Sequence, residues 1–91
     1  MLNLNEFVTF VTVTDTGSFS LAAEKLEVSK ALVSKHIGDL ERSLGVKLLH
    51  RTTRKLGLTP AGAVFYERCR ELLDHVDHAR GELERFRDAP G

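Results

Sequence analysis

Residues 18–45 read SFSLAAEKLEVSKALVSKHIGDLERSLG and combine two short amphipathic segments with a tight turn between them. In the first segment, Ala22, Ala23 and Leu26 form a small apolar face that lets another helix approach closely. The pattern breaks after Leu26, and Ser29 then supplies a hydroxyl that can cap a second helix. Two short helices joined in this way are typical of a helix-turn-helix motif.

The second segment of this motif is apolar on one side and polar on the other. Val33, Ile37, Leu40 and Leu44 are spaced four, three and four residues apart, which predicts one buried helical face. The polar and basic residues near its start must then face outward, namely Lys30, Ser34, Lys35 and His36. Such a helix is suited to a DNA groove, because cations and the positive end of the helix dipole attract phosphate.

The charge of the chain supports this interpretation once it is divided along the sequence. The whole chain has a formal net charge of zero. Residues 1–24 hold three acids and no base, residues 25–55 hold eight bases and three acids, and residues 56–91 hold five bases and seven acids. Because nucleic acid responds to local patches of charge, overall neutrality does not exclude it as a ligand of the basic middle segment.

Size, cysteine content and hydropathy set further limits. Ninety-one residues suit one domain with a modest core. The single cysteine, Cys69, excludes a disulfide within the chain and lies on an apolar helical face, so we expect a buried structural thiol in a reducing compartment. No apolar run approaches the roughly 20 residues of a membrane span, and the N-terminus lacks the features of a signal peptide. We therefore expect a cytoplasmic, nucleoid-associated protein.

The segment before the motif, residues 4–15, carries conflicting local signals. Its helical face consists of Leu4, Phe7, Val8 and Val11. Asn3 or Asn5 can cap a helix here and Gly17 can end it. Residues 11–14 instead alternate like a strand and are rich in β-branched side chains. We predict a helix and expect long-range packing to decide between the two structures.

After the motif, residues 46–58 are too short and too β-branched for another helix. Val46, Leu48 and His50 alternate with Lys47, Leu49 and Arg51. The polar and basic residues 52–55 then separate this stretch from Leu56, Gly57 and Leu58. This order predicts a small hairpin with a basic tip, which is called a wing when it follows a helix-turn-helix.

The last helix has a clear start and a long apolar stripe. Thr59 can cap it, and Pro60 suits the first helical position, where a missing N–H costs no hydrogen bond. The stripe repeats at heptad spacing: Phe65, Cys69, Leu72, Val76, Ala79, Leu83 and Phe86. A helix over residues 60–86 would be about 40 Å long, more than the rest of the domain can cover. We expect the stripe to pair two protomers; the alternative is a stripe covered entirely by the domain's own first helix.

With these features the chain resembles, over essentially its whole length, the N-terminal DNA-binding domain of LysR-type transcriptional regulators. The resemblance rests on GSFSxAAxxL over residues 17–26, VSxxxVSxxIxxLExxLG over residues 28–45 and VxLLxRTTRxLxLTxAG over residues 46–62, together with Leu4, Phe7 and Val8. Several apolar and glycine positions agree in fixed register, which makes the match specific.

The resemblance implies a mainly α-helical fold and a partner. A winged helix-turn-helix of three helices and a small β-hairpin would occupy residues 1–58, a linker and dimerisation helix residues 59–88, and the start of a hinge residues 89–91. The family pattern is a homodimer on double-stranded DNA, with a tetramer allowed in a full-length protein. A small-molecule effector would bind only a C-terminal domain that is absent from these 91 residues.

The residues and the resemblance indicate the same two elements as the DNA-binding site. We expect contact with base edges in the major groove from Lys30, Ala31, Leu32, Ser34, Lys35 and His36, although a core position is equally compatible with Leu32. We expect wing and phosphate contacts from Ser18, Ser20, Ser29, Arg51, Thr52, Thr53, Arg54 and Lys55. Among these, Arg54 is the residue expected to enter a minor groove, where A·T-rich DNA concentrates negative potential.

Some of these residues have an alternative role within the domain. Ser18 and Ser20 lie near the start of a predicted helix and are helix caps first. Arg51 lies at the end of a predicted strand and can equally form an internal ion pair with Asp39 or Glu41.

The chain also departs from the family pattern. Many members have Gln-Pro or Gln-Ser where this chain has Lys30 and Ala31. Glutamine can pair bidentately with adenine, whereas lysine favours guanine or a phosphate, so the preferred operator does not carry over from the family. Leu49 stands where many members have phenylalanine, which should change only the packing of the wing.

Other classes of function have weaker support. Asp74, His75, Asp77 and His78 could suggest a metal site, but they lie on the polar side of the stripe, where a solvated face is the simpler interpretation, and we expect no cofactor. No Ser-His-Asp arrangement, glycine-rich phosphate loop or pair of buried carboxylates can be argued, so an enzyme is not expected. A winged helix that binds protein should expose apolar or acidic residues on the motif, whereas those exposed here are basic.

Overall fold

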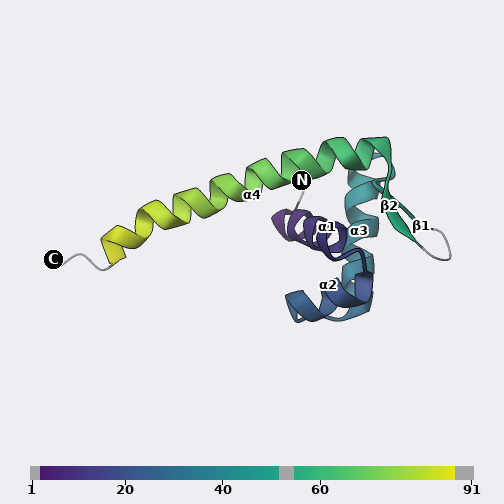
Figure 1. The fold of residues 1–91 in the computed structure, drawn as a ribbon, viewed down its shortest axis with the longest axis horizontal. Coiled ribbons are helices and arrows are strands. Elements are labelled where there is room, and N and C mark those ends of the chain that lie inside the picture. Colours follow the sequence, from purple (N-terminus) through teal and green to yellow (C-terminus); the bar gives the residue numbers. More distant parts are fainter. Residues whose placement is uncertain (1–2, 52–54, 88–91) are drawn as a thin grey trace.

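The computed structural model describes residues 3–51 and 55–87, with Arg51 described by its backbone alone, and this part of the chain contains four helices and one two-stranded sheet (Figure 1). The elements are α1 (Leu4–Thr16), α2 (Phe19–Leu26), α3 (Lys30–Leu44), β1 (Leu49–Arg51), β2 (Leu56–Leu58) and α4 (Pro60–Arg87). The predicted mainly helical fold with a small hairpin is confirmed. In Figure 1 the hairpin projects from one side of the three-helix body, and α4 extends from the body in the other direction.

Helix α1 is the central helix of the body. Asn3 caps it by accepting a hydrogen bond from the backbone N–H of Asn5, and Gly17 ends it at a φ of 70°. The helix contacts α2, α3 and α4, and its residues 9–13 are buried in one continuous run. The predicted apolar face is therefore only partly right: Phe10 and Val13 are fully buried, whereas Leu4 is 44% exposed.

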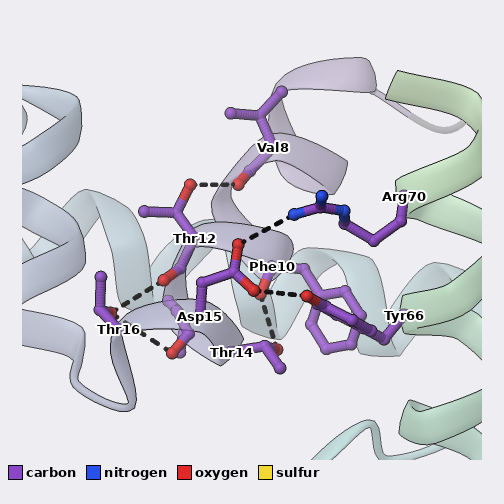
Figure 2. A network of polar contacts seen from close by, with 9 residues as sticks. Val8, Phe10, Thr12, Thr14, Asp15, Thr16, Tyr66 and Arg70 are labelled. Carbon is purple, nitrogen blue, oxygen red and sulfur yellow. Dashed lines mark hydrogen bonds and ion pairs between the residues drawn. The ribbon is translucent and has the colours of Figure 1, made fainter. Parts of the chain in front are cut away.

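The threonines of α1 explain how a segment rich in β-branched residues forms a helix. The hydroxyls of Thr9, Thr12, Thr14 and Thr16 each donate to the backbone carbonyl four residues earlier, at 2.8–2.9 Å. Figure 2 shows this pattern at the C-terminal end of the helix. Because the hydroxyls bond to the helix itself, Thr9 and Thr12 can be buried without an unsatisfied polar group. Packing of α1 against α2, α3 and α4 then favours a helix over the strand that the alternation of residues 11–14 suggested.

The helix-turn-helix forms as the sequence predicts. Ser18 and Ser29 cap α2 and α3, accepting from the backbone N–H groups of Leu21 at 3.1 Å and Leu32 at 3.0 Å. Glu27 ends α2 in a left-handed conformation, with φ of 57°. The predicted core face of α3 is confirmed: Val33, Ile37 and Leu40 are buried and Leu44 is half-buried.

The hairpin is held against the body at its base. Its strands pair antiparallel with Leu49 opposite Leu58 and His50 opposite Gly57. The predicted alternation before the tip is wrong at one point, because Leu48 and Leu49 are both buried and β1 begins only at Leu49. Leu48 instead packs beneath the start of α4, where its carbonyl accepts from the N–H of Thr59.

The start of α4 confirms the predicted cap. The hydroxyl of Thr59 accepts from the N–H of Gly62 at 2.9 Å and donates to the carbonyl of Lys47 at 2.6 Å. A Cβ on Gly62 would lie 2.0 Å from the carbonyl oxygen of Leu48, so only glycine permits this close approach of helix and hairpin.

The apolar stripe of α4 divides into two parts with different surroundings. The ring of Phe65 packs edge-on against Phe7 with 5.5 Å between centroids, and it also contacts Phe10. Cys69 is 2% exposed, and burial raises the pKa of its thiol to about 11. Cys69 and much of Phe65, two members of the predicted dimerisation set, therefore pack in or against the core of the protomer itself. The remaining members, Leu72, Val76, Ala79, Leu83 and Phe86, are exposed.

Candidate nucleic-acid interface

The first turn of α3 presents its side chains to solvent. The Ser29 cap fixes where the helix starts, and Lys30, Ala31 and Leu32 follow as exposed residues. Leu32 is 36% exposed while Val33 is fully buried, so the open question about Leu32 is decided in favour of the surface. Within the described residues no ion pair holds Lys30. Its ammonium group is available beside the positive end of the helix dipole.

The second turn of α3 carries a cation that already has a partner. Ser34 and Lys35 are exposed, and Lys35 Nζ lies 2.7 Å from Asp39 Oδ2. Asp39 also accepts from Arg42, and these bonds, led by that from Lys35, hold the pKa of Asp39 below its usual value. A phosphate that binds Lys35 must therefore compete with a carboxylate of the same helix, whereas one that binds Lys30 does not.

His36 differs from the other predicted base-contact residues. It is half-buried, and its Nδ1 lies 2.8 Å from the hydroxyl of Thr9 on α1. Because that hydroxyl donates its hydrogen to the carbonyl of Asn5, the imidazole Nδ1–H is the donor to Thr9. This bond fixes the ring against α1, so at most the second ring nitrogen is left for a ligand.

The serines at the start of α2 divide into a cap and a surface residue. Ser18 is half-buried and its hydroxyl is used as the cap, which agrees with its predicted first role. Ser20 lies two residues further along, in the first turn of α2, and is exposed. Ser20 is therefore the more accessible of the two hydroxyls for a phosphate.

The hairpin contributes fewer described residues to the site than the sequence predicts. Thr52, Thr53, Arg54 and the side chain of Arg51 lie outside the described residues, and Lys55 before β2 is exposed. The acids considered as partners of Arg51 have other donors. Asp39 binds Lys35 and Arg42, and Glu41 binds backbone groups and lies 3.7 Å from Lys47 Nζ.

Sequence reasoning missed Glu41 as the residue that positions the hairpin. Its carboxylate is 12% exposed and accepts from the backbone N–H groups of Leu48 at 2.8 Å and Leu49 at 3.2 Å. The bonds join α3 to the first strand and so fix the hairpin relative to the helix that precedes it. The residue types could not reveal this contact, because the donors are backbone groups seven and eight residues away.

The candidate metal residues lie apart from this surface. Asp74, His75, Asp77 and His78 are exposed on the second half of α4. Over residues 3–51 and 55–87, no group of three or more His, Cys, Asp or Glu side chains is arranged to hold a metal ion. Within the same residues, every helix is too short or too polar to span a membrane.

Comparison with known proteins identifies relatives of the whole arrangement. The family model of bacterial regulatory helix-turn-helix proteins, lysR family, matches residues 4–63. An HTH-type transcriptional regulator of Xanthomonas campestris pv. campestris (strain 8004) is 41% identical over 88 residues, which are 97% of this chain and 26% of the relative. The chain spans about a quarter of the length of the curated relatives it matches.

Two solved structures of similar fold contain DNA. The BenM DNA-binding domain in its complex with catB site 1 DNA has a TM-score of 0.90 at 34% identity, covering 98% of this chain and 99% of that one. The CbnR DNA-binding domain in its DNA complex has a TM-score of 0.83 at 31% identity, covering 96% and 99% of the two chains. The likeness therefore includes the long helix as well as the helix-turn-helix.

Proposed function

The chain belongs to the LysR family of bacterial regulatory helix-turn-helix proteins, as a DNA-binding domain of that family, and from this premise we propose how it reads DNA. Helix α3 enters the major groove and the hairpin tip enters an adjacent minor groove. The observation that carries this proposal is the exposed first turn of α3, where a Ser29 cap, a cation without an ion pair in the described residues and the helix dipole coincide.

Within α3 the residues divide between specificity and attachment. Lys30, Ala31, Leu32 and Ser34 contact base edges, and an exposed Leu32 or Ala31 can meet a thymine methyl group. Lys35 and His36 are shared between bases and the phosphate backbone, and Lys35 must leave Asp39 to make either contact. Ser20 and the cap residues Ser18 and Ser29 lie beside the same backbone.

The hairpin supplies the second contact region. Arg54 enters the minor groove, with Arg51, Thr52, Thr53 and Lys55 on the flanking phosphates. Glu41 supports this placement, because it fixes the base of the hairpin to the helix that reads the major groove.

The exposed part of α4 pairs two protomers, so that two copies of α3 meet a dyad-symmetric operator. In this arrangement the winged helix-turn-helix of residues 1–58 binds DNA, and residues 59–88 form the linker and dimerisation helix. The hinge starts at residue 89. Leu83 and Phe86 are 64% and 62% exposed, which supports a partner for this part of the stripe. The relatives are regulators of transcription, which favours a binding protein over an enzyme and the nucleoid as its place of action.

Regulation by an effector would require a longer protein that contains this domain. The chain covers 26% of the Xanthomonas relative, which leaves room for an effector-binding domain outside these residues. A small-molecule effector and a tetramer are therefore proposed only for a longer protein.

The decisive experiment selects bound duplexes from a random pool at two salt concentrations and then compares two lysine variants. Lys30→Ala should relax preference at one base pair by about 1–3 kcal/mol, because it removes a base contact. Lys35→Ala should weaken all duplexes alike and lower the salt slope by about one. Negligible effects of both variants would remove α3 from the interface.

Sedimentation tests the pairing separately. Leu72→Glu and Val76→Glu place a charge on the exposed part of the stripe and should yield monomers. An unaltered mass for both would show that the stripe does not hold the dimer.

A further inference from the structure

A carboxylate at the end of α1 joins two side chains of α4. Asp15 Oδ1 accepts a hydrogen bond from the hydroxyl of Tyr66 at 2.5 Å, and Asp15 Oδ2 lies 3.4 Å from Arg70 Nη1 (Figure 2). Tyr66 and Arg70 are four residues apart and lie on one face of α4. One acid therefore holds the long helix at two points, one turn apart. We call Asp15, Tyr66 and Arg70 the α1–α4 clamp.

The apolar contacts beside the clamp do not fix the direction of α4 by themselves. Phe65 packs against Phe7 and Phe10, and Cys69 is buried, so the first half of α4 must lie on α1. Burial of apolar surface is not directional, whereas a hydrogen bond weakens as its angle departs from linear. The clamp is thus the part of this contact that is sensitive to the angle between the helices.

The clamp keeps its donor over the pH range in which DNA is bound. The hydrogen bond to Asp15, together with partial burial, raises the pKa of Tyr66 above its ordinary value of 10.0. Its hydroxyl stays protonated at neutral pH and continues to donate.

We propose that the α1–α4 clamp sets the direction of α4 and thereby the half-site spacing that the paired protein accepts on DNA. This inference rests on the proposed pairing through α4. Residues 74–87 extend about 20 Å beyond the contact with α1, so a tilt of about 10° moves their end by about 3.5 Å. That displacement is close to the roughly 3.4 Å axial step of one base pair. A tilt in each protomer therefore changes the distance between the two copies of α3 by about the axial length of one base pair or more.

The test measures affinity as a function of spacing. The chain and two conservative variants, Tyr66→Phe and Asp15→Asn, are titrated with duplexes whose two half-sites are separated by zero, one or two base pairs more or fewer than the selected operator. A duplex with a single half-site serves as reference. The unaltered chain should lose at least about tenfold in affinity for each added or removed base pair, and the variants should lose about threefold or less. Their affinity for the single half-site should not change.

A matched control separates the clamp from a general change of charge on α4. Glu71→Gln also converts a carboxylate to an amide, but Glu71 is exposed and pairs with Arg68 of the same helix. It should keep the spacing profile of the unaltered chain. If both clamp variants keep that profile as well, the inference is overturned while the proposed function stands. If the unaltered chain itself is indifferent to spacing, the proposed pairing on a dyad operator fails, and the inference fails with it.

A second measurement needs no DNA. Spin labels on the exposed positions of Ser20→Cys and Glu84→Cys report the distance between α2 and the far half of α4, with labelled chains diluted in unlabelled protein. Cys69 is buried and leaves the introduced thiols as the labelled ones. Tyr66→Phe should broaden the distance distribution by several ångströms. An unchanged distribution would overturn the clamp whatever the spacing profile.

Discussion

The two halves of α4 share one helix and one heptad pattern, yet they differ in almost every contact. Over residues 60–73 the helix lies on α1 and the hairpin base, and it contributes Cys69 and part of Phe65 to the core. Over residues 74–87 every side chain is exposed, including Val76, Leu83 and Phe86. A heptad stripe therefore indicates that a partner surface is needed, while the length of α1 decides how much of that surface the protomer itself supplies.

Among substitutions in α4, the greatest loss of stability is expected at Gly62, and Gly81 in the other half is its matched control. Gly62→Ala puts a Cβ against the carbonyl of Leu48, which belongs to the backbone and can move only with the hairpin. We expect a loss of about 4 kcal/mol or more in the free energy of unfolding, measured with urea. Gly81→Ala in the other half meets no atom within 4 Å and should gain about 0.5–1 kcal/mol from helix propensity. Equal effects at both sites would abolish the contrast between the halves.

Phe65 and Phe86 give a second contrast between the two halves of α4. Phe65→Ala removes a ring that packs against Phe7 and Phe10, and it should destabilise the protomer by about 3 kcal/mol at any protein concentration. Phe86 is 62% exposed, so Phe86→Ala should change the stability of the protomer by less than about 0.5 kcal/mol. Urea unfolding over a dilution series measures both. A loss for Phe86→Ala that persists at the lowest concentration would contradict its exposure.

The reactivity of thiols tests burial directly. The pKa of Cys69 is raised to about 11 from 9.0 by burial, so at pH 8 the reactive thiolate is about 100-fold scarcer than for an ordinary cysteine. We expect iodoacetamide to modify Cys69 at least about 100 times more slowly than the thiol introduced by Leu83→Cys, as followed by mass spectrometry. Similar rates would show that the first half of α4 opens as readily as the second.

The smallest effect is expected from an ion pair within the exposed half. Asp77 and Arg80 are 3.7 Å apart, and their side chains are 72% and 77% exposed. Asp77→Asn should change the free energy of unfolding by less than about 0.5 kcal/mol, because water screens the pair. A loss above about 1 kcal/mol in thermal unfolding would reveal a contact of this half that the protomer alone does not provide.

Local patterns predicted the elements whose form depends on neighbouring residues. Spacing alone identified the buried face of α3, and the hydroxyl positions identified the caps Ser18, Ser29 and Thr59. These predictions succeed because a cap or a helical face involves residues within one or two turns of each other. The exposed first turn of α3 belongs to the same class, since its outward orientation follows from the buried face.

Predictions that depend on distant segments were incomplete. The continuous burial of residues 9–13 of α1 requires three neighbouring helices, and the link between His36 and Thr9 joins residues 27 positions apart. The bonds of Glu41 to the N–H groups of Leu48 and Leu49 involve no side chain at the donor end, so no residue type marks them. In each case the information lies in the packing rather than in the spacing.

Hydrophobic period and capping chemistry act over a few residues, so the amino-acid pattern was enough to predict a helix-turn-helix with a basic second helix, a short hairpin and a long capped helix. The division of the long stripe into a core part and an exposed part depends on the packing of the folded domain. The contact of Asp15 with two side chains of α4 depends on it as well. Both outcomes depend on where α1 lies, and burial and hydrogen-bond geometry between distant segments are set by the assembled fold.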